Sequence, residues 1–440
     1  MRLKAIFTAI FIHGCNVEIL MFFIYNIYIM SRKSHSNKKR NHKILNIIIA
    51  VDCLLIVSLL IFGTNLLFFD NQLFVSTMNI SASYENPISE NLMPEPTQSP
   101  VLPASTPIPI TPIPTAEPVD EPAEEQPAHT PIMIFTGDVL LDGSVRNIIN
   151  SQGLDAVFPV EYRAPFHNAD IVMINLEMPM SNRGTPDPDK EFSFRGDPSG
   201  IVLLSDMGVS IVTLANNHTL DYGREAFLDT LELLEQNSIK YVGGGRDKAE
   251  AMQWVTLHAG DKNIAFLAAS RVIPTTDWYA TLSRSGLFGT YDPTELNRQI
   301  TLAKKEADYV IVYVHWGVER NTIPENWQRT MAFGYIDAGA DAVVACHPHV
   351  LQGFEFYSDK LIAYSLGNFI FTNDQRDTAA LELTINTDGG LSARIYPYEI
   401  INRSTVMMTD PDKLERLKGH LNEISFNAVI DSDFNIIKTP

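Results

Sequence analysis

The chain has 440 residues, with 52 Asp and Glu against 33 Lys and Arg, and its formal net charge is −19 at pH 7. This charge argues against a nucleic-acid partner, because phosphate backbones are bound through clustered Lys and Arg. The only cysteines are Cys15, Cys53 and Cys346, so we expect no disulfide framework. The first third does not look globular, so we expect the functional residues from 131 onward.

Residues 44–69 form a mostly apolar run that is long enough to cross a hydrocarbon core of about 30 Å. Six Lys and Arg residues precede it within 32–43, and the next one is Arg146. The positive-inside rule then predicts a transmembrane signal-anchor, with 1–43 cytoplasmic and the remainder extracellular. A cleaved signal peptide is the alternative. Residues 1–30 are either a second apolar span or a wrongly included stretch before a start at Met30.

Residues 70–130 are expected to form a Pro-, Thr- and Glu-rich linker without a core. Twelve prolines fall between Pro94 and Pro131, a composition that favours extended polyproline II. The segment is either a spacer that holds a domain away from the membrane or an unstructured linker with no length requirement.

From residue 131 onward, apolar and often β-branched runs that end in polar or small residues alternate with helical patterns. The expected strands lie in 131–138, 169–177, 209–218, 239–245, 263–270, 308–317 and 340–349. The expected helices are 223–237, 294–306 and 326–338. Later strands are expected at 353–357 and 360–365, with a β-rich stretch at 379–400. This alternation predicts an α/β domain over 131–400, followed by a tail, 401–440, with a possible helix at 411–423.

Metal-ligand types of side chain recur at or just after the expected strands, which is where an α/β sheet places the residues of a site. Carboxylate, imidazole and amide groups suit divalent metals, and a two-metal site needs several of them converging from different segments. The candidate ligands are Asp138, Glu177, Asn217, His315, His347 and His349.

Two of these clusters carry more information than the others. His347 and His349 flank Pro348 and would lie on the same side of an extended segment, which is a chelating geometry. His218 has Asp221 three residues on, so the carboxylate could orient the imidazole as a general acid if both lie on the first turn of the following helix. A helix cap is the structural alternative for Asp221.

Five motifs in order resemble the CapA-type poly-γ-glutamate capsule synthesis proteins, a branch of the calcineurin-like metallophosphoesterase superfamily. The resemblance runs from about Ile132 to about Thr372 and rests on FRGDP (194–198), ANNHTLDYG (215–223), HWGVE (315–319), HPHVLQ (347–352) and YSLGNF (364–369). It implies a four-layer αββα metallophosphoesterase-like sandwich around one or two divalent ions such as Mn, Fe or Zn.

The resemblance also implies a role for each candidate. Asp138 and His349 would bind the first metal, Asn217, His315 and His347 the second, and Glu177 stands near the superfamily's bridging Asp. His218, with Asp221, would be the catalytic pair. Arg195 and Asn368 are candidate substrate contacts, and Asn368 is alternatively a hydrogen-bond partner of a metal ligand or part of a turn with Gly367.

One residue departs from the family pattern, and two further features each allow two interpretations. Leu140 replaces the His of the superfamily's Asp-x-His motif, so the number of bound metals stays open. Cys346 is either a small buried residue or a group beside the metal. Gly243–Gly245 form either a plain turn or an anion cradle.

The apolar segment 44–69 and the resemblance together predict a membrane-anchored extracellular protein of poly-γ-glutamate synthesis or export. Its chemistry would be attack on a phosphoester or an amide. Its partners would be the anionic polymer or a phosphoester substrate, together with capsule synthetase subunits. Two alternatives stay open, namely a non-catalytic assembly or export subunit and a general metal-dependent phosphoesterase. Loss of the imidazole at Leu140 favours the assembly subunit, whereas the intact Asn217 and His218 pair favours catalysis.

Overall fold

The computed structural model describes residues 129–188, 190–372 and 377–440. The predicted N-terminal segment 1–43 and transmembrane helix 44–69, and the linker up to residue 128, lie outside these ranges. Within them, no helix is both long enough and apolar enough to cross a membrane.

The first sheet has eight strands, of which five run parallel to one another. Its order is β16 (Ser404–Met407), β15 (Leu391–Ile401), β14 (Asp377–Ile385), β1 (Ile132–Val139), β2 (Ile171–Leu176), β3 (Val209–Thr213) and β4 (Lys240–Val242), with β13 (Asn368–Ile370) also paired to β1. β14, β15 and β16 are antiparallel to their neighbours.

The second sheet has six strands with a parallel centre. Its order is β11 (Phe354–Tyr357), β12 (Lys360–Ala363), β10 (Ala342–Cys346), β9 (Tyr309–His315), β7 (Lys262–Ser270) and β6 (Val255–Ala259). β1, β2, β9 and β10 come from mostly apolar runs, as expected for strands covered on both faces.

Alternation of side chains along these strands builds three cores. In β1, Met133 and Phe135 face a core shared with Ile311 and Tyr313 of β9, which places this core between the two sheets. Ile134 lies instead in a second core on the outer face of the first sheet. A hydrogen bond from Tyr313 Oη to the carbonyl oxygen of Thr136, at 2.6 Å, crosses between the sheets.

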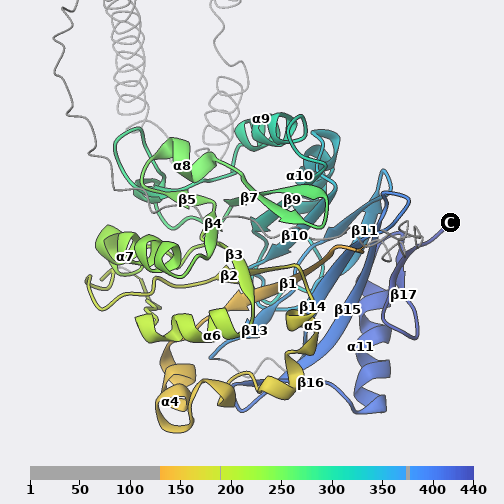
Figure 1. Cartoon of the computed structure of the whole chain (residues 1–440), viewed down its shortest axis with the longest axis horizontal. Helices are drawn as coiled ribbons and strands as arrows, with labels where there is room; N and C mark the ends of the chain where they lie inside the picture. Colours follow the sequence, from red (N-terminus) through yellow and green to blue (C-terminus); the bar gives the residue numbers. More distant parts are fainter. Residues whose placement is uncertain (1–128, 189, 373–376) are drawn as a thin grey trace, which may run out of the picture. The chain divides into compact units, whose positions relative to one another are not determined.

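Helices cover the outer face of each sheet, so the domain has helix, sheet, sheet and helix layers (Figure 1). The first sheet is covered by α4 (Gly143–Gln152), α5 (Ala164–His167), α6 (Ile201–Asp206) and α7 (Gly223–Gln236). The second sheet is covered by α8 (Lys248–Met252), α9 (Thr294–Ala303) and α10 (Asn326–Asp337). The predicted α/β class and the three predicted helices that became α7, α9 and α10 are confirmed.

The glycines at 243–245 serve packing rather than forming a free loop. Gly244 and Gly245 form β5, which pairs with β8 (Gly286–Leu287). A Cβ atom on Gly245 would lie 2.5 Å from the backbone nitrogen of Ala251, so a side chain there would collide with α8. The following Arg246 is paired with Glu235 and Glu250.

Residues 401–440, which the sequence sets apart as a tail, contribute further elements to the domain. They form β16 and then α11 (Pro411–Ile424), β17 (Ala428–Ile430) and β18 (Ile436–Lys438). Leu417 and Leu421 of α11 are fully buried in the core between the sheets. Figure 1 shows α11 alongside β15.

Candidate metal centre

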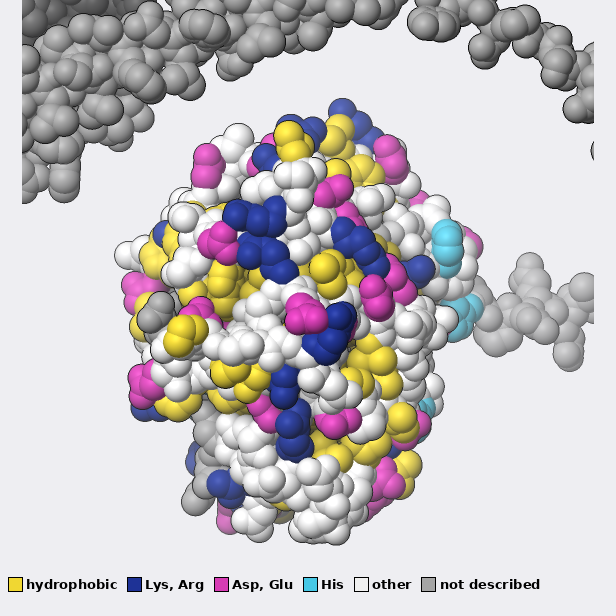
Figure 2. All heavy atoms as spheres, turned by 90° about the vertical axis from the view of Figure 1, so that its left-hand side faces the viewer, with side chains coloured by type: hydrophobic (Ala, Val, Ile, Leu, Met, Phe, Trp, Pro, Cys, Tyr) yellow, Lys and Arg dark blue, Asp and Glu magenta, His cyan; other side chains and the backbone are white. Residues whose placement is uncertain are grey.

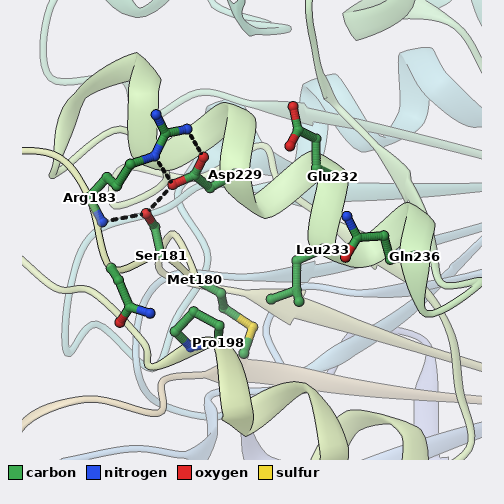
Figure 3. A pocket seen from close by; sticks show the side chains of 9 residues that line it. Met180, Ser181, Arg183, Pro198, Asp229, Glu232, Leu233 and Gln236 are labelled. Carbon is green, nitrogen blue, oxygen red and sulfur yellow. Dashed lines mark hydrogen bonds and ion pairs between the residues drawn. The ribbon is translucent and has the colours of Figure 1, made fainter.

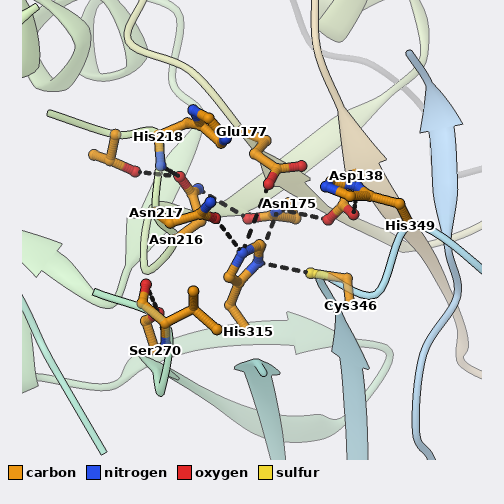
Figure 4. Close-up of polar contacts among 12 residues, drawn as sticks. Asp138, Asn175, Glu177, Asn216, Asn217, His218, Ser270, His315, Cys346 and His349 are labelled. Atoms are coloured by element: carbon orange, nitrogen blue, oxygen red, sulfur yellow. Dashed lines mark hydrogen bonds and ion pairs between the residues drawn. The ribbon is translucent and has the colours of Figure 1, made fainter. Parts of the chain in front are cut away.

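The carboxyl ends of the central strands bring polar side chains from both sheets to one place (Figure 4). In the first sheet, Asp138 of β1 lies opposite Asn175 of β2 and opposite Asn368 of β13. In the second sheet, His315 of β9 lies opposite Cys346 of β10. The strand register therefore assembles a cluster that the chain sequence spreads over more than two hundred residues.

Asp138 is fully buried at the end of β1. Its Oδ1 accepts a hydrogen bond from Asn175 Nδ2 at 2.8 Å, and its Oδ2 lies 3.2 Å from His349 Nδ1. Burial opposes ionisation, but the contact with His349 and its positive charge outweigh burial and hold the pKa of Asp138 below its ordinary value. Asp138 is therefore a carboxylate at neutral pH.

Glu177 follows β2 and is also fully buried. Its Oε1 lies 3.6 Å from His315 Nε2, and neither carboxylate oxygen has a hydrogen-bond partner in the described part of the chain. Burial and the negative charge of Asp138 raise the pKa of Glu177 well above its usual range. A cation placed between the two carboxylates would reverse this effect.

His315 lies at the centre of the cluster, at the end of β9. Its Nε2 lies 2.7 Å from Asn217 Oδ1, and its Nδ1 lies 3.2 Å from Cys346 Sγ. Burial, together with the charge of His347, lowers the pKa of His315 well below its ordinary value. The imidazole is therefore neutral, which is the form that binds a metal.

His347 and His349 do not lie on an extended segment, and that prediction is wrong. β10 ends at Cys346, and the two histidines have positive φ angles of 99° and 59°. The turn still brings their rings together, with centroids 5.7 Å apart, and His347 lies 4.7 Å from the ring of His315. A left-handed backbone is uncommon for residues other than glycine, so both histidines are held in place by their surroundings.

The donor set fits a divalent metal. In each of three groups of residues, the ligand atoms lie within 4.8 Å of one another. The groups are Asp138, Glu177 and His349; Glu177, His315 and His347; and Asp138, His315 and Cys346. Four buried atoms of these candidate ligands have no hydrogen-bond partner among the described residues, namely Asp138 Oδ2, the two oxygens of Glu177 and His347 Nδ1. Buried polar atoms without partners cost stability, and bound ions in these ligand groups would supply partners for them.

Two asparagines that sequence reasoning missed hold the carboxylates and the His218 loop in place. Asn175 Nδ2 donates to Asp138, and Asn175 Oδ1 accepts from Asn216 Nδ2 at 3.0 Å. Asn216 Oδ1 accepts from the backbone nitrogen of His218 at 3.0 Å and from Thr219 Oγ1 at 2.8 Å. The signal was present, since Asn175 directly precedes the Leu176–Glu177 pair and Asn216 precedes Asn217.

His218 and Asp221 are in contact as predicted, with His218 Nδ1 2.6 Å from Asp221 Oδ2. They lie in the loop before α7, not on its first turn, and Asp221 does not cap that helix, whose N-cap is Tyr222. Lys190, which the sequence did not single out, contacts Asp221 Oδ1 and lies 2.6 Å from the carbonyl oxygen of Asn217. Burial lowers the pKa of His218, and the contact with Asp221 offsets only part of this effect.

The two predicted substrate contacts differ in their surroundings. Asn368 is buried, and its Oδ1 lies 2.8 Å from His349 Nδ1, which places Asn368 behind a candidate ligand. Arg195 instead packs over the ring of Tyr222, 4.3 Å from its centroid, and donates to the carbonyl oxygen of Arg183 at 2.9 Å. Arg195 therefore borders the His218 loop without contacting a candidate ligand.

A surface pocket of about 300 Å³ lies beside α7, and none of the candidate ligands lines it (Figure 3). Its Arg183 is paired with Asp229 and Glu225, and Ser181 Oγ also bonds to Asp229. On the face shown in Figure 2, Lys and Arg side chains are interspersed with Asp and Glu. Arg183, Asp229 and Glu225 at this pocket are thus paired with one another, in contrast to the unsatisfied atoms of the metal-ligand cluster.

The chain is similar to a known protein family and to named relatives. The family model described as "Bacterial capsule synthesis protein PGA_cap" matches residues 132–373. The PGA biosynthesis protein CapA of Bacillus subtilis (strain 168) is 31% identical over 279 residues, which cover 60% of this chain and 70% of that protein. The capsule biosynthesis protein CapA of Bacillus anthracis is 30% identical over 279 residues, which cover 61% and 67%.

Among solved structures, the calcineurin-like phosphoesterase YfkN from Bacillus subtilis is 14% identical with a TM-score of 0.37, over 68% of this chain and 98% of that chain. The match to the family model begins at β1 and ends just beyond β13. It therefore includes every candidate ligand of the cluster.

Proposed function

This chain belongs to the bacterial capsule synthesis protein PGA_cap family, and from this premise we propose that it acts in the synthesis or export of poly-γ-glutamate at the cell surface. The relatives named for PGA biosynthesis and for capsule biosynthesis support this role. The apolar segment 44–69 and the basic residues before it support a membrane anchor with the described domain outside the cell. In that location the domain would meet the polymer and the capsule synthetase subunits.

The single observation that carries a chemical role is the buried set of unsatisfied ligand atoms. Asp138, Glu177 and His349 would hold one divalent ion, and Glu177, Asn217, His315 and His347 would hold a second. Glu177 belongs to both sets, so its two free oxygens are placed to be shared. A bound divalent ion would polarise a phosphoryl or carbonyl oxygen and stabilise the negative charge that develops during hydrolysis.

The chain's own residues add a positioned imidazole beside these ligands. Asp221 and Lys190 fix the ring of His218, and Phe194 packs on it with centroids 4.6 Å apart. Since Nδ1 faces the Asp221 carboxylate, Nε2 is the ring atom left for the reacting group. With its pKa lowered by burial, His218 is neutral at pH 7 and is suited to accept a proton at Nε2 before passing it to a leaving group.

One observation favours a second candidate function, a non-catalytic assembly or export subunit. Leu140, which stands where the superfamily motif has a His, is fully buried in the outer core of the first sheet. It fills apolar space, so it supplies no ligand and the first ion loses an imidazole. A centre with one weakly held ion would suit a structural role or binding of the polymer's carboxylates.

Metal content and polymer yield test the two functions together. We expect the purified full chain to carry one or two divalent ions by elemental analysis and the His347→Ala/His349→Ala variant to lose them. His258→Ala, which changes an exposed histidine on β6, is the matched control and should keep the metal.

Polymer yield is then measured in cells that depend on the variant chain. A His218→Asn chain that keeps its metal and loses the polymer supports hydrolysis, whereas full yield supports the assembly role. No bound metal after manganese or zinc is supplied would contradict the metal centre itself.

A further inference from the structure

Two arginines near the metal-ligand cluster lack the acidic partner that most arginines of this domain have. Ion pairs join nine other arginines to carboxylates, namely Arg146, Arg163, Arg183, Arg224, Arg246, Arg284, Arg298, Arg329 and Arg416. Neither Arg271 nor Arg320 forms an ion pair with a carboxylate in the described ranges. In a chain of net charge −19, positive charges without an acidic partner are available for an anionic ligand.

Arg271 is anchored to the strand that carries His315. It directly follows β7, and its backbone nitrogen donates to the carbonyl oxygen of His315 at 2.8 Å. Its guanidinium carbon lies 4.2 Å from the ring centroid of Trp327 and 5.3 Å from that of Tyr291. Only one guanidinium hydrogen bond is formed among the described residues, to the carbonyl oxygen of Tyr291 at 3.3 Å.

The two aromatic rings restrict the side chain of Arg271 without neutralising it. A guanidinium group stacked on aromatic rings keeps its charge and its in-plane N–H donors. An arginine held in this way loses little further conformational entropy when it binds an anion. Arg271 is therefore pre-arranged to donate to a carboxylate.

Arg320 is anchored to the turn that carries the two other histidines. Its backbone nitrogen donates to the carbonyl oxygen of Pro348, between His347 and His349, at 2.7 Å. The residue is exposed and has a φ of 64°. No hydrogen bond or ion pair of its side chain occurs within the described ranges.

The two arginines belong to one region of the domain. β7, β9 and β10 are neighbours in the second sheet, and the segment from Trp316 to Glu325 runs from the end of β9 to the N-cap of α10. Arg320 lies in this segment, and Trp327, which packs on Arg271, lies two positions beyond its end. The backbone of each arginine is thus hydrogen-bonded to a segment that carries a candidate ligand.

We propose that Arg271 and Arg320 bind carboxylates of a γ-linked polyglutamate chain and guide it to the metal-ligand cluster. This inference rests on the proposed function and names the group that would recognise the substrate. A polyanion approaching an acidic protein is repelled unless local positive charge compensates. The two guanidinium groups supply that charge, and each residue of the polymer supplies one carboxylate for such a contact.

The test measures binding of a fluorescent γ-linked glutamate oligomer of about ten residues to the purified full chain. We expect Arg271→Gln and Arg320→Gln each to weaken binding by about tenfold, as is usual for a lost charge-assisted contact, and the double variant to weaken it further. Arg298→Gln is the matched control, because Arg298 is exposed on α9 and pairs only with Glu295. Its dissociation constant should equal that of the unchanged chain.

Two further arms separate this inference from a packing role and from phosphate binding. An oligomer with amidated carboxylates should bind weakly and be insensitive to both substitutions. Arg271→Lys, which keeps the charge without the planar donors, should retain part of the binding even if Arg271→Gln fails to fold. Inorganic phosphate, added as a competitor, should displace the oligomer only at concentrations far above those of the oligomer.

Several outcomes would overturn the inference. These are unchanged binding in the double variant, no binding of the oligomer by the unchanged chain, or arginine-dependent binding of phosphate without binding of the oligomer. Loss of oligomer binding in the double variant, with metal content unchanged, would support it. A chain that holds no metal but still binds the oligomer through these arginines would refute the metal centre and leave this inference standing.

Discussion

His347 and His349 are two positions apart, yet their surroundings shift their pKa values in opposite directions. Burial lowers the pKa of His347 to about 3, and the positive charge of His349 adds to that shift. For His349 burial also acts downward, but the contact with Asp138 and the charge of Glu177 outweigh it and raise the pKa to about 10. Without a bound ion, the His349 imidazolium thus balances the buried carboxylates.

We expect the metal-free protein to lose stability as the pH rises from 7 to 9.5. The pKa of His349 is raised by folding, so its stabilising effect is complete below about 6.5 and disappears as the pH passes about 10. The loss should be on the order of 1–3 kcal/mol. Urea denaturation of the compact unit Pro118–Pro440 in a chelator would measure it. His349→Gln should flatten the dependence, and equal slopes in both proteins would contradict the assignment.

Asp221→Asn tests whether the carboxylate positions His218. The substitution keeps the volume but removes the charge that holds both His218 Nδ1 and Lys190. We expect polymer yield to fall by about 10- to 100-fold, a usual cost of disturbing an acid–base group, while metal content stays constant. Asp229→Asn, which changes a carboxylate beside the pocket near α7, should leave the yield unchanged. A normal yield from Asp221→Asn would remove the pair from the mechanism.

At the scale of elements, one buried carboxylate joins α10 to β11. Glu355 is 2% exposed and accepts two hydrogen bonds from Arg329 at 2.9 and 2.6 Å and one from Tyr364 Oη at 2.7 Å. Arg329 also packs over the ring of Phe426, 4.2 Å from its centroid. The cluster therefore ties the helix, the sheet and the C-terminal segment together.

Glu355→Gln should lower the free energy of unfolding by about 2–3 kcal/mol. Removing one partner of a buried pair leaves the other charge uncompensated, and partial exposure of Arg329 reduces the cost. Thermal or urea unfolding would measure the loss. Glu295→Gln, which breaks an exposed pair within α9, should change stability by less than about 1 kcal/mol. Similar losses of stability in the two variants would mean that the buried pair contributes no more to the free energy of unfolding than the exposed pair does.

The elements that the sequence predicted are those whose signal is local. β1, β2, β9 and β10 follow from apolar runs, and α7 from three- and four-residue spacing. The turn at His347–His349 could not be predicted, because its left-handed backbone is imposed by contacts such as that of His349 with Asn368, nineteen positions away in the chain. Lys190 was missed for the same reason, since its partner Asp221 lies on another segment.

At the scale of the whole molecule, the cluster depends on two sheets that meet face to face. Candidate ligands come from both sheets, so any relative shift of the sheets changes distances at the centre. The core between the sheets is extended by α11, whose Leu417, Leu421 and Ile424 pack with residues of β14 and β15. The C-terminal segment therefore belongs to the framework that holds the site.

Leu421→Ala should destabilise the domain by about 2–5 kcal/mol, because it removes a fully buried side chain and leaves a cavity in the shared core. Leu282→Ala makes the same chemical change at a position that is 89% exposed, and should alter stability by less than about 0.5 kcal/mol. Urea denaturation of both variants of the unit Pro118–Pro440 would measure the difference. If Leu421→Ala lowers metal content in proportion to its loss of stability, α11 supports the centre through the core. Equal stability of the two variants would instead show that the C-terminal segment packs on the sheets without supporting them.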